Sequence, residues 1–207
     1  MDAIRFDRHV VCRIHTQAHN SMNKSFLLGI IGISTFAYGA YTPIKAELAQ
    51  YLIQSAWNVS NNTGYQVKPW NWMDSHPVMR LSSTKHNQDL IVLSGDTGNV
   101  LAFGPGHNTN TTHPGRDGTT LISGHRDTHF DFLQDVSMGD EFKLDSMLDN
   151  DDYTYKVSDI KIIDSDQQDI SISNNQSQLK LVTCYPFNSP IAGGPLRYVV
   201  TASLVSK

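Results

Sequence analysis

Short apolar-rich runs, each bounded by Gly, Asp, Asn or Pro, follow one another from residue 77 to the end of the chain. Runs of this length and punctuation predict β-strands. Past residue 65 no long helical pattern occurs, and the segment 128–136 predicts one or two helical turns. Strands joined mainly by turns disfavour a doubly wound parallel sheet and predict a mainly β fold, a closed eight-stranded barrel with short helices. The eight runs are PVMRLSS (77–83), DLIVLSG (89–95), VLAFGPG (100–106), TTLISGH (119–125), DEFKLDS (140–146), YTYKVSDIKIID (153–164), LKLVTCY (179–185) and RYVVTASLV (197–205).

Residues 25–44 form an uncharged segment between Lys24 and Lys45. Twenty helical residues span about 30 Å, the thickness of one hydrocarbon core. Basic residues outnumber acidic ones before this segment, whereas acidic residues prevail after it. Because positive flanks stay in the cytoplasm, the pattern predicts a single-pass signal-anchor helix in the inner (plasma) membrane, with the rest of the chain on the periplasmic side. The alternative is a cleavable signal peptide that starts at Met22 and is cut before Ala40, and it exports the same part of the chain.

The run IKAELAQYLIQSAWN after Pro43 places Leu48, Tyr51, Leu52 and Ala56 at helical spacing, which predicts a short amphipathic helix. Turn-forming residues in VSNNTG then end it. The longest predicted loop, 104–118, is rich in Gly, Pro, Asn and Thr, and is expected to shape a binding mouth. The predicted domains are a cytoplasmic tail (1–24, with 1–21 absent if translation starts at Met22), a transmembrane helix (25–44), an amphipathic helix with linker (45–64) and the barrel (65–207).

Composition excludes some classes of function. With 39% apolar and 17% charged residues the chain is typical of globular proteins. Its formal net charge is −4, and no cluster of basic residues of the kind that follows phosphates is present. Nucleic acid is therefore not expected as a partner.

Two cysteines stand on opposite sides of the predicted membrane segment, Cys12 before it and Cys184 after it. They cannot pair within one inserted chain, and an unpaired thiol is a liability in an oxidising compartment, so its presence suggests use. Cys184 ends an alternating strand run, where a side chain is able to face a cleft. A thiol becomes nucleophilic as the thiolate, which needs a cationic neighbour.

His125 and Arg197 are the candidates for cationic neighbours of Cys184. His125 follows the apolar strand TTLIS and a glycine, so it stands at a strand end as Cys184 does. Arg197 begins the last apolar strand, a short loop after Cys184, and its guanidinium is able to present two parallel N–H groups to an oxyanion. If these strand ends meet at one barrel mouth, the three residues specify acyl transfer through a thioester.

Other interpretations of the same residues stay open at this point. Taken alone, Cys184 could be a small buried apolar residue, and His125 could be a structural or capping residue. Arg197 could be a surface residue in an ion pair. A metal site is the competing chemical hypothesis, but the sequence around the histidines indicates a strand end and a turn rather than a helix, and one thiol forms no structural thiolate site. We therefore predict no metal and no cofactor. The candidate ligands crowd into 25 residues: His107, His113, Asp117, His125, Asp127, His129 and Asp131.

The stretches SGHRDTHFDFLQDVSMGDEFKL and LKLVTCYPF…GGPLRYVV resemble the sortase family. Sortases are membrane-anchored cysteine transpeptidases with a closed eight-stranded barrel, and the family's His, Cys and Arg fall on His125, Cys184 and Arg197. LAQYLIQSAW, PWNWMD, LAFGPGH, HPG and CYPF are similar to the class GN type of Gram-negative bacteria. By this resemblance His107 of GPGH is an accessory residue of a loop bordering the cleft, and Thr183 and Asp127, from the same motifs, are expected to be substrate-binding or accessory.

The resemblance implies that Cys184 attacks a backbone carbonyl in the C-terminal sorting signal of an exported protein and that an amine then attacks the thioester. The sorting signal and the amine acceptor are not written in the sequence. Two alternatives remain: an exported cysteine protease that hydrolyses the same thioester, and a membrane-tethered barrel that binds without turnover.

Overall fold

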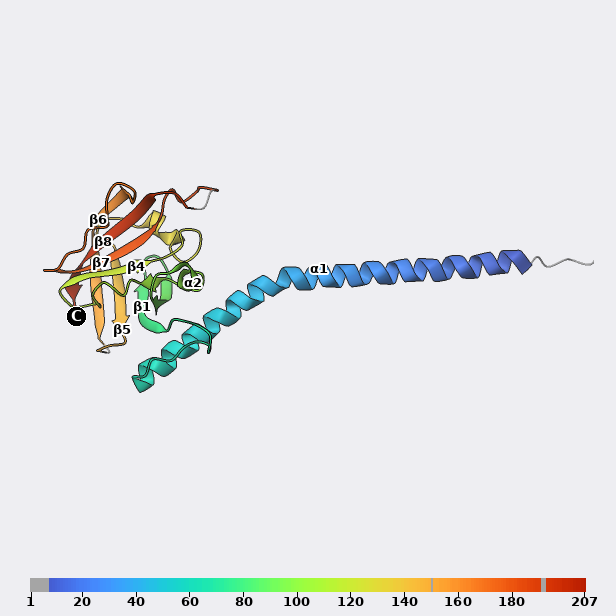
Figure 1. Ribbon diagram of the computed structural model, residues 1–207, viewed down its shortest axis with the longest axis horizontal. Coiled ribbons are helices and arrows are strands. Elements are labelled where there is room, and N and C mark those ends of the chain that lie inside the picture. The colour runs from blue at the N-terminus through green and yellow to red at the C-terminus, as the bar shows by residue number, and fades with distance from the viewer. Residues whose placement is uncertain (1–7, 150, 191–192) are drawn as a thin grey trace, which may run out of the picture. The chain divides into compact units, whose positions relative to one another are not determined.

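The computed structural model describes residues 8–149, 151–190 and 193–207, with side chains from residue 24 onward except at positions 37, 40, 42 and 43. The chain divides into two compact units, residues 1–48 and 49–207. The second unit contains the barrel and the end of the long helix that precedes it (Figure 1).

The helix α1 runs without a break over Arg8–Thr63. The prediction of a separate second helix after Pro43 is therefore wrong, because the helical backbone continues through that position. Among the described residues, no helix is both long and apolar enough to cross a membrane. Residues 1–7 of the predicted tail lie outside the described part of the chain, as do four side chains of the predicted membrane segment. Large apolar side chains of the first unit are exposed: Phe26, Leu27, Leu28, Ile30, Ile31, Ile33, Phe36, Tyr38, Tyr41 and Ile44.

Eight strands form a closed barrel in the order β1-β2-β3-β4-β7-β8-β6-β5. The barrel prediction is thereby confirmed, and the predicted turns within 128–136 are the 3-10 helix η1 (Asp131–Asp135). Most neighbours are antiparallel, whereas β2–β3 and β4–β7 are parallel. The strands are β1 (Pro77–Ser83), β2 (Gln88–Ser94), β3 (Gly106–His107), β4 (Gly118–Ser123), β5 (Glu141–Ser146), β6 (Asp152–Asp164), β7 (Ser177–Cys184) and β8 (Leu196–Ser206).

One of the eight predicted strands is wrong in most of its length. Of the run 100–106, the first two residues belong to the short helix α2 (Gly98–Leu101), and only Gly106 reaches a strand. Gly106 lies so close to the preceding turn that a Cβ there would be 2.2 Å from the Gly95 carbonyl oxygen. The pairing of β3 thus depends on the close approach of the Gly106 backbone to the Gly95 backbone, which the pattern of apolar residues does not reveal.

The last turns of α1 belong to the barrel unit. Their buried side chains are Ile53, Ala56, Trp57 and Ser60. Ala56 of the predicted apolar face is buried, whereas Leu48 and Tyr51 are exposed, so that face is confirmed only in part. The helix ends as predicted: Gly64 has φ +73° and donates from its N–H to the Ser60 carbonyl at 2.8 Å, a left-handed C-terminal cap.

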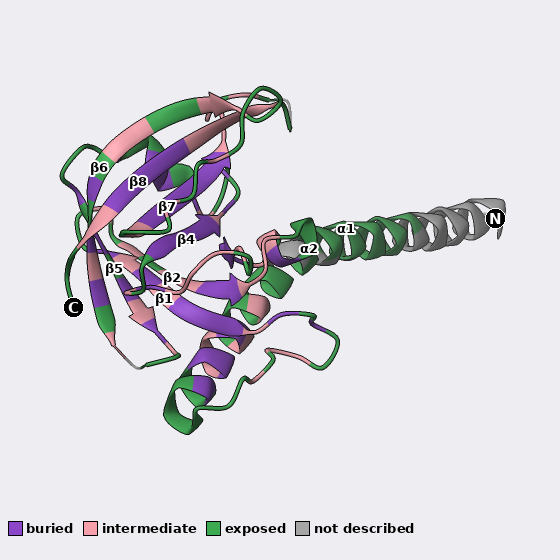
Figure 2. Cartoon of the chain, turned by 60° about the vertical axis from the view of Figure 1, so that its left-hand side comes forward, coloured by how far each residue is buried: buried purple, intermediate pink, exposed green. Residues whose placement is uncertain are grey.

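Alternation along the strands divides buried residues between the inside and the outside of the barrel (Figure 2). The main core, which includes Ile122, Leu181 and Val200, fills the interior. A second cluster, in which Leu93 of β2 meets Ile53 of α1, Met73 and Val100, joins the helix end to the outside of the sheet. Trp70 packs at the edge of this cluster, with its ring centroid 5.0 Å from that of Phe103. The helix end is thereby fixed to the barrel.

Candidate active site

Three neighbouring strands bring Cys184, His125 and Arg197 to one edge of the sheet. Cys184 is the last residue of β7 and is the register partner of Arg197 on β8. On the other side of β7, the parallel ladder with β4 pairs Ser123 with Val182 and continues through the Gly124 N–H, which donates to the Val182 carbonyl at 3.0 Å. His125 follows at once. Neighbouring strands lie about 4.8 Å apart, so Cys184 and Arg197 stand side by side, and His125 directly follows the segment that runs beside β7. The three residues are called the row below.

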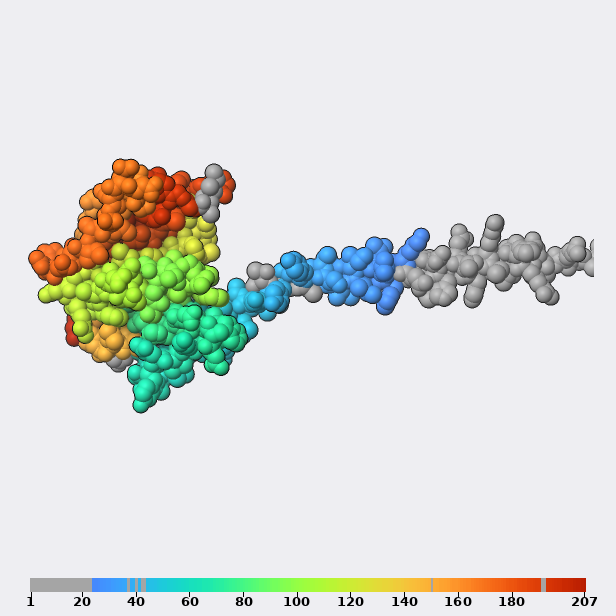
Figure 3. Space-filling model, viewed as in Figure 1, coloured from blue at the N-terminus to red at the C-terminus, as the bar shows by residue number. Residues whose placement is uncertain are grey.

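The strands that form this row are far apart in sequence. In the space-filling view the yellow-green segment that contains β4 adjoins the orange to red C-terminal segment that contains β7 and β8 (Figure 3). Cys184 and Arg197 are half-buried, and His125 is exposed. The described cysteine is a free thiol. A nucleophile, an imidazole and a guanidinium are thus all accessible from one side of the sheet.

The row stands beside a buried apolar cluster on the outer face of the sheet. Leu121, Val182 and Val199 alternate with interior residues of β4, β7 and β8 and form a cluster of their own. Ile163 and Ile170 pack against them from β6 and from the loop between β6 and β7. Because side chains two residues apart share a face, Cys184 and Arg197 project from the same face as Val182 and Val199.

Gly124 and Thr183 fix the backbone directly before His125 and Cys184. Thr183 is 2% exposed, and its Oγ1 donates to the Gly124 carbonyl at 2.7 Å. A Cβ on Gly124 would lie 2.7 Å from the ring of Phe130, so only glycine allows that ring to pack here. The Phe130 N–H in turn donates to the His125 carbonyl at 3.0 Å. The Thr183 hydroxyl is thereby bonded to the backbone inside the barrel, and a substrate-binding or accessory role for Thr183 stays a prediction.

Asp127 and its neighbour Arg126 lie just beyond His125. The Asp127 side chain is 67% exposed and accepts a hydrogen bond from Arg126 Nε at 3.2 Å. Arg126 is buried, 4% exposed, and its two terminal nitrogens donate to carbonyls of the loop after Cys184. Sequence reasoning missed Arg126, because an arginine between a histidine and an aspartate is typical of a solvated turn.

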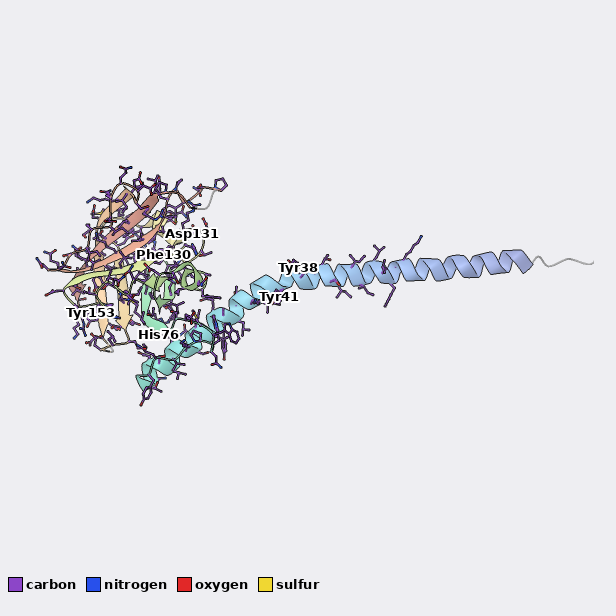
Figure 4. The ribbon with its side chains drawn as sticks, in the orientation of Figure 1. Tyr38, Tyr41, His76, Phe130, Asp131 and Tyr153 are labelled. Atoms are coloured by element: carbon purple, nitrogen blue, oxygen red, sulfur yellow. The ribbon has the colours of Figure 1, made fainter. Side chains whose placement is uncertain are left out.

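His107 is not part of the row. It is 2% exposed, pairs with Ile122 in the β3–β4 ladder, and lines a cavity of about 160 Å³ together with His76 and His113. Cys184, His125 and Arg197 do not line this cavity. In Figure 4 His76, another residue of this cavity, lies in the lower part of the barrel, below Phe130. His107 thus lines a cavity apart from the row, and its role as an accessory residue stays a prediction.

Burial lowers the pKa values of four histidines in and near these regions. Three of them line the cavity, and burial lowers the pKa of each: His76, His107 and His113. Burial also lowers the pKa of His129, and the nearby His125 imidazole lowers it further. Among the described residues no three His, Cys, Asp or Glu side chains gather in a way that could hold a metal ion. The row of Cys184, His125 and Arg197 is the arrangement with an evident chemistry.

A comparison with protein families matches residues 81–205 to the sortase domain. The chain belongs to the sortase family. Sortases are cysteine transpeptidases, and the matched region contains all three residues of the row. In a search of curated proteins, sortase D of Bacillus subtilis (strain 168) is 32% identical over 127 residues, which is 61% of this chain and 63% of the relative.

Solved structures of sortases share the fold. The Clostridium perfringens sortase D5 transpeptidase matches with a TM-score of 0.62 and 21% identity, over 77% of this chain and 99% of that one. Sortase C1 of Streptococcus agalactiae matches with a TM-score of 0.54 and 26% identity, over 62% and 67% of the two chains. These relatives are named sortases D, D5 and C1, so the assignment of this sortase to class GN stays a prediction.

Proposed function

We propose that this sortase is a transpeptidase that cleaves the C-terminal sorting signal of an exported protein through a thioester on Cys184 and transfers the acyl part to an amine. The observation that carries the proposal is the register of the three strands. β7 places Cys184 opposite Arg197, and the β4–β7 ladder ends one residue before His125. Nucleophile, proton carrier and oxyanion donor therefore project from adjacent strand ends.

In the first step the Cys184 thiolate attacks the scissile carbonyl carbon and forms a carbon–sulfur bond. The carbonyl π electrons move to oxygen, and the resulting oxyanion collapses with loss of the C–N bond. His125, as imidazolium, gives its proton to the departing amine and becomes neutral. In the second step an incoming primary amine attacks the thioester, neutral His125 accepts its proton, and the thiolate leaves. The product is a new amide bond.

Arg197 is proposed to stabilise the oxyanion. Its Nη1 donates to two carbonyls of its own loop, Gly194 at 2.6 Å and Leu196 at 3.0 Å. These contacts hold the guanidinium at the end of β8, beside the register position of Cys184. Because a guanidinium carries five N–H donors, anchoring through one nitrogen leaves others for the substrate oxygen.

The apolar cluster of Leu121, Val182 and Val199 supports a fixed arrangement of the row. Each of the three side chains is buried, and Ile163 and Ile170 pack against them. Burying such side chains is favourable by about 25 cal/mol per Å², so the cluster holds β4, β7 and β8 together next to Cys184 and Arg197.

We further propose that the N-terminal segment anchors the sortase in the inner membrane, single-pass, with the barrel unit on the periplasmic side. The support is the uncharged segment 25–44 with its basic flank and the exposed apolar side chains of α1 between Phe26 and Ile44. Cell fractionation tests this: the protein should stay in the membrane pellet after alkaline carbonate. Recovery in the soluble fraction would contradict it.

The activity is tested with the full chain in detergent, a library of extended peptides and hydroxylamine as amine. A thioester intermediate yields a peptide hydroxamate, which mass spectrometry separates from the free acid. Hydroxamate with wild type and none with Cys184→Ala supports the transpeptidase. Free acid alone, with or without hydroxylamine, indicates a hydrolytic protease. Binding without either product indicates a barrel that does not catalyse.

A further inference from the structure

Arg126 connects the two chain segments that carry His125 and Cys184. It immediately follows His125, and its side chain is 4% exposed. Its Nη1 donates to the Pro186 carbonyl at 2.7 Å, and its Nη2 donates to the Ser189 carbonyl at 2.9 Å. Both carbonyls belong to the loop that begins directly after Cys184.

The geometry of the side chain suits this connection. A guanidinium presents its N–H groups in a planar fork, so one side chain is able to hold two carbonyls at once. The carbonyls are the first and last of a tight turn, since the Ser189 N–H also donates to the Pro186 oxygen at 3.4 Å. Arg126 thus secures this turn as a unit against the residue next to His125.

Two polar side chains of the described residues cross between these segments: Thr183 Oγ1 donates to the Gly124 carbonyl at 2.7 Å, and Arg126 donates to the turn after Cys184. Its Nε donates to the exposed carboxylate of Asp127. The backbone ladder between β4 and β7 ends at Gly124, one residue before His125. Thr183 joins the segments just before Cys184 and His125, and Arg126 joins them just after these two residues.

We propose that Arg126 is a positioning residue that fixes His125 relative to Cys184 by holding the turn 186–189. The proposal rests on the proposed function, because it assigns the residue to the acyl-transfer chemistry of the same site. Arg126 does not contact substrate in this account. Its loss should therefore change the rate of the chemical steps rather than the binding of the peptide.

The test compares Arg126→Gln and Arg126→Lys with wild type and with Arg116→Gln, which alters an exposed arginine of the loop before β4. Full-length proteins in detergent are assayed for kcat and KM of hydroxamate formation. The rate of Cys184 alkylation by iodoacetamide is measured from pH 5 to pH 10. Melting temperature and circular dichroism report folding. A His125→Ala variant serves as the reference, because it gives the pH profile of Cys184 alkylation without the imidazole of His125.

A displacement of about 1 Å is able to cost on the order of 10²-fold in rate, so Arg126→Gln should lower kcat by about that factor with KM changed less than about threefold. Its alkylation profile should shift toward that of His125→Ala. Arg126→Lys should behave likewise, because one ammonium does not reproduce the fork between the two carbonyls. Arg116→Gln should match wild type.

A folded Arg126→Gln or Arg126→Lys with wild-type kcat and a wild-type alkylation profile overturns the proposal. A raised KM at unchanged kcat also overturns it, since that assigns the residue to substrate binding. If Arg126→Gln does not fold, Arg126→Lys decides, and failure of both to fold shows a purely structural role. Should wild type form no hydroxamate, the proposed function fails by itself, and the alkylation profiles still decide whether Arg126 positions His125.

Discussion

Cys184 and Arg197 are register partners in the antiparallel pair β7–β8. Both project from the outer face of the barrel, two residues beyond the apolar pair Val182 and Val199. The thiol and the guanidinium are therefore held on one ladder, next to a buried apolar cluster. This relationship supports the proposal that Arg197 is the oxyanion donor for a Cys184 nucleophile.

Replacing Arg197 should reduce turnover without unfolding the barrel. Arg197→Ala removes the proposed oxyanion donor, and loss of such a donor costs about 10²- to 10³-fold in kcat. Arg197→Lys should recover little, since an ammonium does not present two parallel N–H groups. Steady-state kinetics of hydroxamate formation measures both, with Arg116→Ala as the exposed-arginine control. Wild-type kcat in Arg197→Ala would remove Arg197 from the mechanism.

Thr183→Val should weaken the link between β7 and the end of β4. The valine keeps the shape of threonine but loses the hydrogen bond to the Gly124 carbonyl, so we expect a loss of about 1–3 kcal/mol in unfolding free energy and a lower kcat. Thr183→Ser retains the hydroxyl and serves as the control. Urea unfolding and kinetics test this, and equal stability of the Val and Ser variants would contradict it.

Gly124→Ala should disturb the turn that presents His125. The new methyl group would lie 2.7 Å from Phe130 Cδ2, and overpacking of this kind costs about 1–3 kcal/mol. Gly98→Ala is a matched control, because a Cβ there meets nothing within 4 Å. Thermal melts should show a lower Tm for Gly124→Ala alone. A Tm equal to that of Gly98→Ala would show that Phe130 moves aside at no cost.

Asp140 makes the stability of the barrel depend on acid pH. Burial opposes ionisation of Asp140, but hydrogen bonds from Lys85, the Ser137 N–H and His86 outweigh it and lower its pKa from 3.8 to about 2. Because the pKa is lowered on folding, the stabilisation is complete above the unfolded value and is lost as pH falls from about 4 toward 2.

The variant Asp140→Asn tests this dependence. At pH 7 it should be less stable than wild type by about 1.5–3 kcal/mol, the contribution of hydrogen bonds to a charged group. The difference should narrow below pH 4, as measured by urea unfolding across the pH range, with Asp74→Asn at an exposed carboxylate as the control. A constant difference from pH 7 to pH 2 would contradict the assignment.

The strands could be predicted because alternation and turn residues are local properties of the sequence. β1 has the predicted bounds, and the strands that carry Cys184 and Arg197 differ from the prediction by at most two residues at either end. It was harder to predict which strands are neighbours. β4 pairs with β7 because the barrel closes, and no local pattern in the sequence indicates that pairing. The sequence could therefore only suggest that the segment of His125 lies beside the strand of Cys184.

Other features escaped prediction because tertiary contacts create them. Arg126 is buried by the turn 186–189, which lies sixty residues further along the chain. The cavity that His107 lines depends on the pairing of β3 with β4, which no local pattern indicates. The buried face of α1 includes Ala56, as predicted, but it also contains Ile53 and Trp57 in place of Leu48 and Tyr51.

The most direct test of the proposed mechanism is the mass of the protein during turnover. Wild type incubated with a cleaved library peptide should carry the acyl part of that peptide on Cys184, and hydroxylamine should remove it as the hydroxamate. His125→Ala should form little of this adduct, and Cys184→Ala none. Cleavage of the peptide by Cys184→Ala, or turnover that never places an acyl group on Cys184, would contradict the account.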